Sequence, residues 1–336
     1  MRIGHFAAVV MCVVPILSCG ANRAAGVSID SRLNKEFDRV EQSLHQLEST
    51  KLPEGLQGLL KTHQASFNEA KNAKSPLLRL YRLRNSDIGV STLQFLAAQK
   101  AAGENVASLE SLWKSRQPAF DGAEKDMPGP AMLVALRQAA GNRARKFFYA
   151  SLPYGKTASP FSGLYYLAEA EGNLRFRGFV ESLLAGQESE QSRPPGAETL
   201  AQALEHLETR TLQAFEDDPV VPATIPVSSR LKETRELLDQ NEIEGATLAL
   251  LESQLEFSRQ TKNVSADPAA TGEVKPAESS LGELISAMAR EDEPQTARII
   301  RNDVQPLYAS LFVATTAAHK TKSSPVTVTL VRWPYT

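Results

Sequence analysis

The chain has 336 residues, with 37 basic and 39 acidic side chains and a formal net charge of −2. A mildly acidic balance argues against nucleic acid as a partner, because binding to a phosphate backbone depends on clustered Lys and Arg. With 42% hydrophobic residues, a chain of this length has enough apolar surface for one large core or two modest ones.

The first segment of the chain has the pattern of a secretory signal. Arg2 supplies a positive charge, and an apolar run follows from Phe6 to Leu17 with Pro15 as its one interruption. A run of this length is short for a membrane span and typical of the hydrophobic region of a signal peptide. The expected signal peptide covers residues 1–18.

The end of the apolar run, from Ile16 to Cys19, resembles the lipobox of bacterial lipoproteins. The resemblance implies that the Cys19 thiol receives a diacylglycerol, that residues 1–18 are removed, and that the new amino terminus is acylated. The mature chain would then be anchored in the cell envelope by its lipid. Gly20 stands where inner-membrane lipoproteins carry a retention aspartate, which favours the periplasmic face of the outer membrane. The alternative is an ordinary signal peptide cut after Gly20 or Ala25.

The two cysteines of the chain fit this prediction. Cys12 lies in the hydrophobic region and would leave with the signal peptide, so Cys19 would be the one cysteine of the mature chain. A mature chain with one lipidated cysteine has no internal disulfide and no thiol nucleophile or metal ligand. The exported domain must therefore be held together by its core.

A tether at residues 19–29 and an N-terminal helical domain at 30–185 are expected next. The first helix has the clearest pattern, in which apolar residues recur at alternating spacings of four and three: Leu33, Phe37, Val40, Leu44 and Leu47. This seam lasts only two to three heptads, which favours a face packed in a bundle over an intermolecular coiled coil.

Local signals place the remaining helices of this domain. Ser75 with Pro76, and Ser159 with Pro160, each pair an N-cap residue with a proline suited to the first helical position. A run rich in proline and glycine at 117–130 predicts a loop. Helices are expected at residues 56–67, 77–102 with a restart at 86 or 87, 106–116, 131–150 and 160–184.

A polar segment at 186–196 that contains Pro194 and Pro195 is the expected linker to a C-terminal helical domain at 197–336. Three prolines within 217–228 predict an extended connection. A weakly apolar stretch at 262–279 predicts a mobile second linker, followed by a capping box from Ser280 to Glu283. Helices are expected at residues 200–215, 231–239, 243–260, from 280, and 294–319 with a bend at Pro306.

Near the end of the chain, the spacing of apolar residues changes from the helical three or four to every second residue. Val326, Val328 and Leu330 alternate with residues of the opposite face, which predicts one β-strand at 325–333. No partner strand is evident in the chain. The strand is expected to pack as an arm on the helices, and the alternative is that it adds to the sheet edge of another protein.

The sequence carries no local signature of catalysis or of a cofactor. None of the four histidines of the mature chain has a glutamate three residues before it, and no zinc-protease, haem or phosphate-loop motif is present. A G-x-S-x-G nucleophile elbow is also absent. A catalytic site would have to be assembled from residues distant in sequence.

The aromatic residues are unevenly distributed. Of the 13 Phe, 7 Tyr and 2 Trp, nine lie between Phe147 and Phe179, interleaved with cationic residues. Rings beside arginines are common in binding surfaces, and the alternative is that these rings close one end of a helical bundle. The candidate binding surface consists of Tyr165, Tyr166, Arg175 and Arg177.

The sequence predicts an all-α fold, an antiparallel helical bundle or stacked helical hairpins in two parts, with the C-terminal strand as an arm. The leading functional hypothesis is a non-catalytic, lipid-anchored envelope protein that acts as a helical scaffold or binds another envelope protein. A small-molecule-binding lipoprotein with an aromatic pocket near Tyr165 and an enzyme with a dispersed site are the alternatives. No cofactor is expected, and the oligomeric state stays open.

Overall fold

The computed structural model describes residues 22–50, 52–122, 127–190, 194–217, 224–261 and 279–320. These residues are mostly helical, and no strand occurs among them, which confirms the all-α prediction for this part of the chain. The signal at 1–18, Cys19, residues 262–278 of the second linker and the predicted strand at 325–333 lie outside the described residues.

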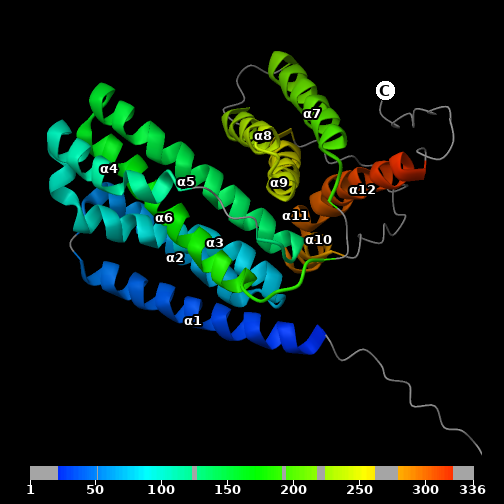
Figure 1. The fold of residues 1–336 in the computed structure, drawn as a ribbon, viewed down its shortest axis with the longest axis horizontal. Helices are drawn as coiled ribbons and strands as arrows, with labels where there is room; N and C mark the ends of the chain where they lie inside the picture. The colour runs from blue at the N-terminus through cyan, green and yellow to red at the C-terminus, as the bar shows by residue number, and fades with distance from the viewer. Residues whose placement is uncertain are drawn as a thin grey trace, which may run out of the picture.

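The helices follow one another along the chain as shown in Figure 1. They are α1 (Asn22–Ser49), α2 (Glu54–Asn72), α3 (Pro76–Ala98), the 3₁₀ turn η1 (Lys100–Gly103), α4 (Val106–Phe120), α5 (Ala131–Thr157), α6 (Pro160–Leu184), α7 (Ala197–Asp217), α8 (Thr224–Asp239), α9 (Ile243–Thr261), α10 (Ser280–Glu291), α11 (Pro294–Ile299), the π turn η3 (Ile300–Val304) and α12 (Gln305–Lys320).

The first six helices form an elongated bundle. α5 and α6 lie antiparallel along most of their lengths, α3 packs on α6, and α1 runs along the outer edge (Figure 1). The predicted seam of α1 is buried at all five positions from Leu33 to Leu47. The seam therefore packs within the chain, as the sequence predicted.

Glycines allow two of these helices to approach closely. A Cβ on Gly163 of α6 would lie 2.6 Å from the Cα of Gly155 on α5 and 2.7 Å from the backbone oxygen of Ser151. A Cβ on Gly172 would lie 2.7 Å from the backbone oxygen of Ile88 on α3. The position of α6 between α5 and α3 thus depends on residues without a side chain.

The C-terminal helices have a core of their own and also share the core of the bundle. α7, α8, α9 and α12 enclose one apolar cluster that includes Leu204, Val227, Leu250 and Leu311. The other side of α9 contributes Leu248, Leu251 and Leu255 to the large cluster of the first six helices, together with α10. The boundary at 186–196 as a division into domains stays a prediction.

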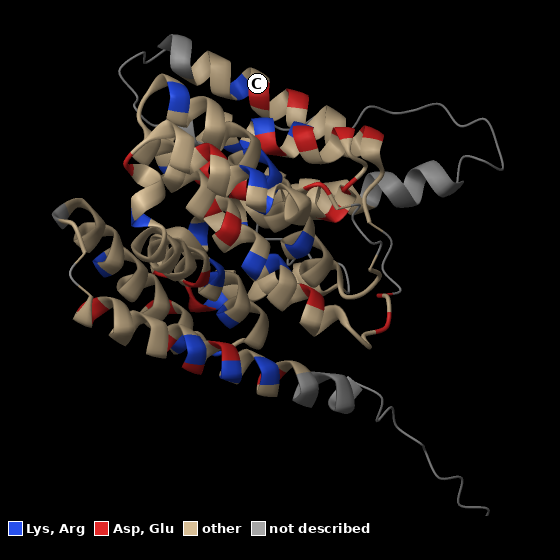
Figure 2. Cartoon of the chain, turned by 60° about the vertical axis from the view of Figure 1, so that its left-hand side comes forward, with Lys and Arg blue, Asp and Glu red and all other residues tan. Residues whose placement is uncertain are grey.

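A polar junction also joins the α8–α9 hairpin to α5. Arg143 of α5 donates two hydrogen bonds to Glu233 of α8, at 2.6 and 3.0 Å, and Lys146 pairs with Glu236 at 3.1 Å. Figure 2 shows cationic and anionic residues interspersed over the described helices. The hairpin is therefore held by complementary charge as well as by apolar contacts.

Two helix starts match their predicted signals. Pro76 and Pro160 are the first residues of α3 and α6, and the Ser159 hydroxyl accepts a hydrogen bond from the Ser162 backbone N–H at 3.0 Å. The predicted capping box is displaced by one residue, because Ser279 caps α10. The Ser280 hydroxyl instead accepts from the Met132 N–H at 3.0 Å and ties α10 to α5.

Prolines account for two corrections to the predicted helix ends. α4 continues through Pro118, so the loop predicted to start at 117 is wrong there; the buried Phe120 ring stacks on Phe148 and holds this last turn. α8 begins at Thr224 with Pro226 in its first turn, so the predicted extended connection is wrong from 224 onward. A proline fits there because the first N–H groups of a helix have no helical partner.

Three further boundaries differ from the prediction. α1 begins at Asn22, inside the segment expected to be a tether, and α5 extends past Pro153 to Thr157. α3 runs without a restart at Ser86, whose buried hydroxyl bonds back to the Leu83 carbonyl oxygen at 3.0 Å. Ahead of Pro306 the helix widens into the π turn η3, which interrupts it near the predicted bend.

Candidate functional site

The end of the bundle where α5 turns into α6 exposes aromatic rings. Tyr149, Tyr154 and Phe161 are 48%, 46% and 46% exposed, and Leu212 on α7 is also exposed among the large apolar side chains of the described residues. We call this end of the bundle, which carries Tyr149, Tyr154, Phe161 and Tyr166, the aromatic end. Tyr149 and Tyr154 are five residues apart on α5 and so point roughly 140° apart around it. Of the four rings, Tyr154 and Tyr166 are in direct contact.

A buried aromatic stack lies beside Tyr149, whose ring meets that of Phe148 edge-on at 5.3 Å. The Phe148 ring is fully buried between Trp113, at 4.7 Å, and Phe120, at 4.2 Å, both from α4. The Trp113 indole N–H donates to the Phe148 backbone oxygen at 3.1 Å. Since ring stacks and a bonded indole leave little rotational freedom, Tyr149 packs against a fixed base.

The exposed rings are themselves ordered by their neighbours. The rings of Tyr154 and Tyr166 stack at 4.4 Å, and Phe147 meets Tyr166 edge-on at 5.7 Å. The Tyr149 hydroxyl donates to Asp121. Tyr149 on one side, and the Tyr154–Tyr166 pair on another, therefore each present a ring held in place together with its hydroxyl group.

The two predicted tyrosines face different surroundings. Tyr166 belongs to the aromatic end, whereas the half-buried Tyr165 donates its hydroxyl to Glu169. Burial, together with the charge of Glu169, raises the pKa of Tyr165 to about 12. Adjacent residues on a helix point roughly 100° apart, which explains the separation.

The two predicted arginines lie away from the aromatic end. Arg175 pairs with the fully buried Asp87 of α3 and with Glu36 of α1, and Arg39 pairs with the same two carboxylates. Burial raises the pKa of Asp87 to about 6, an effect that Arg175 and Arg39 oppose. This group of four charged side chains holds α1 and α3 against α6.

Arg177 bonds Glu181 one turn along its own helix, at 2.7 Å. The structure therefore brings Tyr166 together with rings of α5, and it does not bring Arg175 to that surface. Tyr154 and Phe161, which sequence reasoning did not select, are more exposed than the residues it did. The signal available was their position on either side of Ser159 and Pro160, where a helix pair turns.

A second charged group, also missed, lies inside the molecule. The carboxylate of Glu252 on α9 accepts hydrogen bonds from Tyr81 and Arg84 at 2.9 Å each, and it also pairs with Arg143 and Arg230. Burial alone would raise the pKa of Glu252, but the three guanidinium groups hold it well below its usual range. A carboxylate fixed in its charged form is a structural group and a poor carrier of protons.

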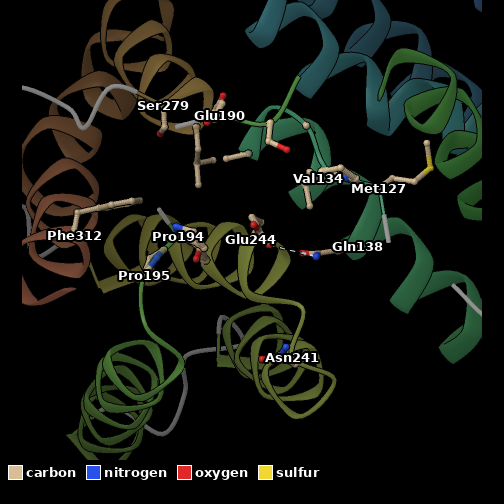
Figure 3. Close-up of a pocket in the computed structure, with 16 residues that line it drawn as sticks. Met127, Val134, Gln138, Glu190, Pro194, Pro195, Asn241, Glu244, Ser279 and Phe312 are labelled. Atoms are coloured by element: carbon tan, nitrogen blue, oxygen red, sulfur yellow. Dashed lines mark hydrogen bonds between the residues drawn. The ribbon is translucent and has the colours of Figure 1, made fainter. Parts of the chain in front are cut away.

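A larger cavity lies elsewhere, among α5, α9, α10 and α12, with residues 189–190 and 194–195 in its wall (Figure 3). Its volume is about 280 Å³. The smaller one, about 20 Å³, borders Tyr81 and Glu252. Tyr165 lines neither of them.

The described residues offer no group of three or more His, Cys, Asp or Glu side chains that could hold a metal ion. No helix among them has the length and apolar character needed to cross a bilayer. The chain matches no protein-family model, no curated protein and no solved structure.

Proposed function

We propose that this chain is a non-catalytic, lipid-anchored protein of the bacterial cell envelope that binds a partner protein through its aromatic end. The observation that carries the proposal is the exposure of Tyr149, Tyr154 and Phe161 together at one end of the bundle. Ordered aromatic rings with nearby hydroxyl groups are the typical anchors of protein interfaces, where they bury much area at little entropic cost.

The direction of the helices supports a protein partner over a lipid surface. The first described residue of α1, Asn22, follows Cys19 by three positions, so the lipid would lie at the start of α1. Near that start, Arg32 donates to the backbone oxygen of Ser182 at the end of α6. Phe161, at the beginning of α6, is 21 residues from Ser182, a span of roughly 32 Å at 1.5 Å per residue.

The aromatic end and the start of α1 thus lie at opposite ends of the bundle (Figure 1). In a protein attached through Cys19, this arrangement would point the aromatic end away from the membrane. The same helices would serve as a spacer between the lipid and the partner.

A photo-cross-linking residue at the exposed position Thr157 tests the proposal in cells that express the full-length protein in its native envelope. We expect a discrete cross-linked adduct that disappears in the Tyr154→Ala/Phe161→Ala double variant. Leu212→Ala is the matched control, because Leu212 is also a large exposed apolar residue but lies on α7. The same cross-linker at exposed Gln202 of α7 controls for the position of the probe.

An adduct that persists in the double variant, or one that forms equally from Gln202, contradicts the proposal. So does loss of the adduct in Leu212→Ala. Circular dichroism and thermal unfolding of the purified variants check that the double variant is folded, as expected for two rings that are nearly half exposed.

A further inference from the structure

The contact between α2 and α3 contains a histidine ring packed on a glycine. A Cβ added to Gly89 of α3 would lie 2.0 Å from Cε1 of His63 on α2, and 2.2 Å from each nitrogen of that ring. The imidazole ring therefore lies directly over the Gly89 backbone, in space that any side chain at position 89 would need. Gly89 is buried, and His63 is half-buried.

The helix faces on both sides of this contact carry no charge. On α2, the residues one turn before and after His63 are Leu59, Leu60, Ser66 and Phe67. On α3, the residues one turn from Gly89 are Asn85, Ser86, Thr92 and Leu93. The nearest charged residue along α2 is the exposed Lys61, which points about 200° away from His63 around the helix.

The charged residues of α3 near this level are paired with other helices. Asp87 precedes Gly89 by two residues and so points about 200° away, where it meets Arg39 of α1 and Arg175 of α6. Arg82 lies two turns before Gly89 and donates to the backbone oxygen of Glu69 at 3.4 Å.

The charged residues of α1 that reach α2 also have partners. Glu41 pairs with Lys71 at 2.8 Å. Glu48 accepts a hydrogen bond from the Gln64 amide group and lies 3.2 Å from the exposed ring of His45. Neither α1 nor α3 therefore supplies a described carboxylate that would stabilise a charged ring on Gly89.

Burial lowers the pKa of His63 below the ordinary 6.5, because the imidazolium form loses hydration in the contact, and no charged group among the described residues contributes to this shift. The packed ring is thus neutral at pH 7. Between its pKa in the contact and 6.5, a ring exposed to water binds more protons than the packed ring does. Acid therefore favours the open contact, and the stability of the contact falls as the pH drops below 6.5.

We propose that the packing of His63 on Gly89 is an acid-sensitive contact, in which protonation moves the ring into solvent and loosens α2 from α3. Leu56, Leu60 and Phe67 remain as buried apolar contacts of α2, so the response is a local opening and not the loss of the fold. This contact is separate from the aromatic end and does not depend on the function proposed for it.

Hydrogen–deuterium exchange of the purified wild-type protein at pH 7 and pH 5, corrected for the intrinsic exchange rates, measures the opening. We expect the protection of the amides in residues 60–67 to fall at least about threefold more in wild type than in His63→Phe, whose ring stays neutral. Asp87 titrates in both proteins alike, so the difference reports on His63. His45→Gln, at an exposed histidine of α1, is the matched control and should respond to acid as wild type does.

An equal fall of protection in wild type and His63→Phe overturns the proposal, and so does a loss of the response in His45→Gln. If His63→Phe does not fold, His63→Gln gives the same comparison with a smaller neutral side chain.

Gly89→Ala tests the geometry of the contact, because its Cβ would displace the His63 ring at any pH. We expect this variant to show reduced protection of residues 60–67 already at pH 7 and little further change at pH 5. In nuclear magnetic resonance titrations, the His63 ring should titrate below 6.5 in wild type and closer to 6.5 in Gly89→Ala. Gly178→Ala, where a Cβ meets no atom within 4 Å, is the matched control and should leave the His63 titration unchanged. A wild-type ring that titrates at or above 6.5, or an unchanged titration in Gly89→Ala, overturns the proposal.

Discussion

Arg84 of α3 and Glu252 of α9 form an ion pair inside the molecule, with 2.9 Å between the guanidinium Nη2 and the carboxylate Oε1. Both side chains are almost fully buried, and 168 residues separate them in the sequence. Arg143 of α5 and Arg230 of α8 approach the same carboxylate. One carboxylate therefore links helices on both sides of the 186–196 segment.

Removal of the Glu252 carboxylate should strongly destabilise the folded protein. Glu252→Gln leaves three guanidinium groups without their shared anion, and we expect the free energy of unfolding to fall by about 3–5 kcal/mol. Chemical denaturation followed by circular dichroism measures the change. Glu256→Gln, one turn along α9 and partly exposed, should cost no more than about 0.5 kcal/mol. Equal stability of the two variants would show that the buried charges do not hold the helices together.

The sequence located the helices, though not all of their ends, because the signals that start and stop a helix are local. Apolar spacing, N-cap serines and first-turn prolines all act within a few residues, and α6 begins and ends where those signals place it. Local signals could not predict the contact between Arg84 and Glu252, because the two residues are far apart in the sequence. Each charge stands in an apolar stripe, with Leu80 and Ile88 four residues on either side of Arg84, which marks an unusual position but does not identify the partner.

The aromatic segment shows the same limit. Composition identified residues 147–179 as unusual, yet helical periodicity directs neighbouring side chains to different surroundings. Tyr166 joins the aromatic end, whereas Arg175 meets Asp87 and Glu36. A list of residues close in sequence therefore could not define one surface.

Asp87 should make stability depend on pH. Its pKa of about 6 in the folded protein exceeds the ordinary 3.8, so between these values the folded state binds more protons than the unfolded state. The contribution of Asp87 to stability should thus fall as pH rises from 4 to 7, by about 3 kcal/mol in total. Urea unfolding at several pH values should show a flatter profile for Asp87→Asn than for wild type. Asp239→Asn, exposed at the end of α8, should follow wild type.

Arg175 and Arg177 should differ sharply in their effect on stability. Arg175→Ala leaves the buried Asp87 with Arg39 alone, and we expect a loss of about 2–3 kcal/mol. Arg177→Ala removes a partly exposed pair within one helix and should cost about 0.5 kcal/mol or less. Thermal and chemical unfolding of the two single variants measure the difference. Similar small losses of stability in both variants would show that Arg175 contributes no more to stability than an exposed residue does.

Two glycines on α6 offer a matched test of helix packing. A Cβ on Gly163 would lie within 2.7 Å of backbone atoms of α5, so Gly163→Ala should destabilise the protein by about 1–3 kcal/mol. A Cβ on Gly178 meets no atom within 4 Å, and Gly178→Ala should stabilise α6 by about 0.5–1 kcal/mol because alanine favours a helix. Opposite signs in denaturant midpoints are expected. The same sign in both variants would mean that α5 can move away from α6 at little cost.

The predicted lipid on Cys19 can be tested by the mass of the mature protein and by fatty-acid labelling. If the resemblance to a lipobox reflects processing, the mature protein from membranes should have an intact mass that corresponds to a chain starting at Cys19 with a diacylglycerol and an added acyl group. Cys19→Ala should abolish labelling by a radioactive or alkyne-tagged fatty acid and leave the precursor poorly processed. Cys12→Ala, in the expected signal peptide, is the matched control and should be labelled like wild type. A mature terminus at Gly20 or beyond, without lipid, would instead identify an ordinary signal peptide and remove the membrane attachment on which the orientation of the aromatic end depends.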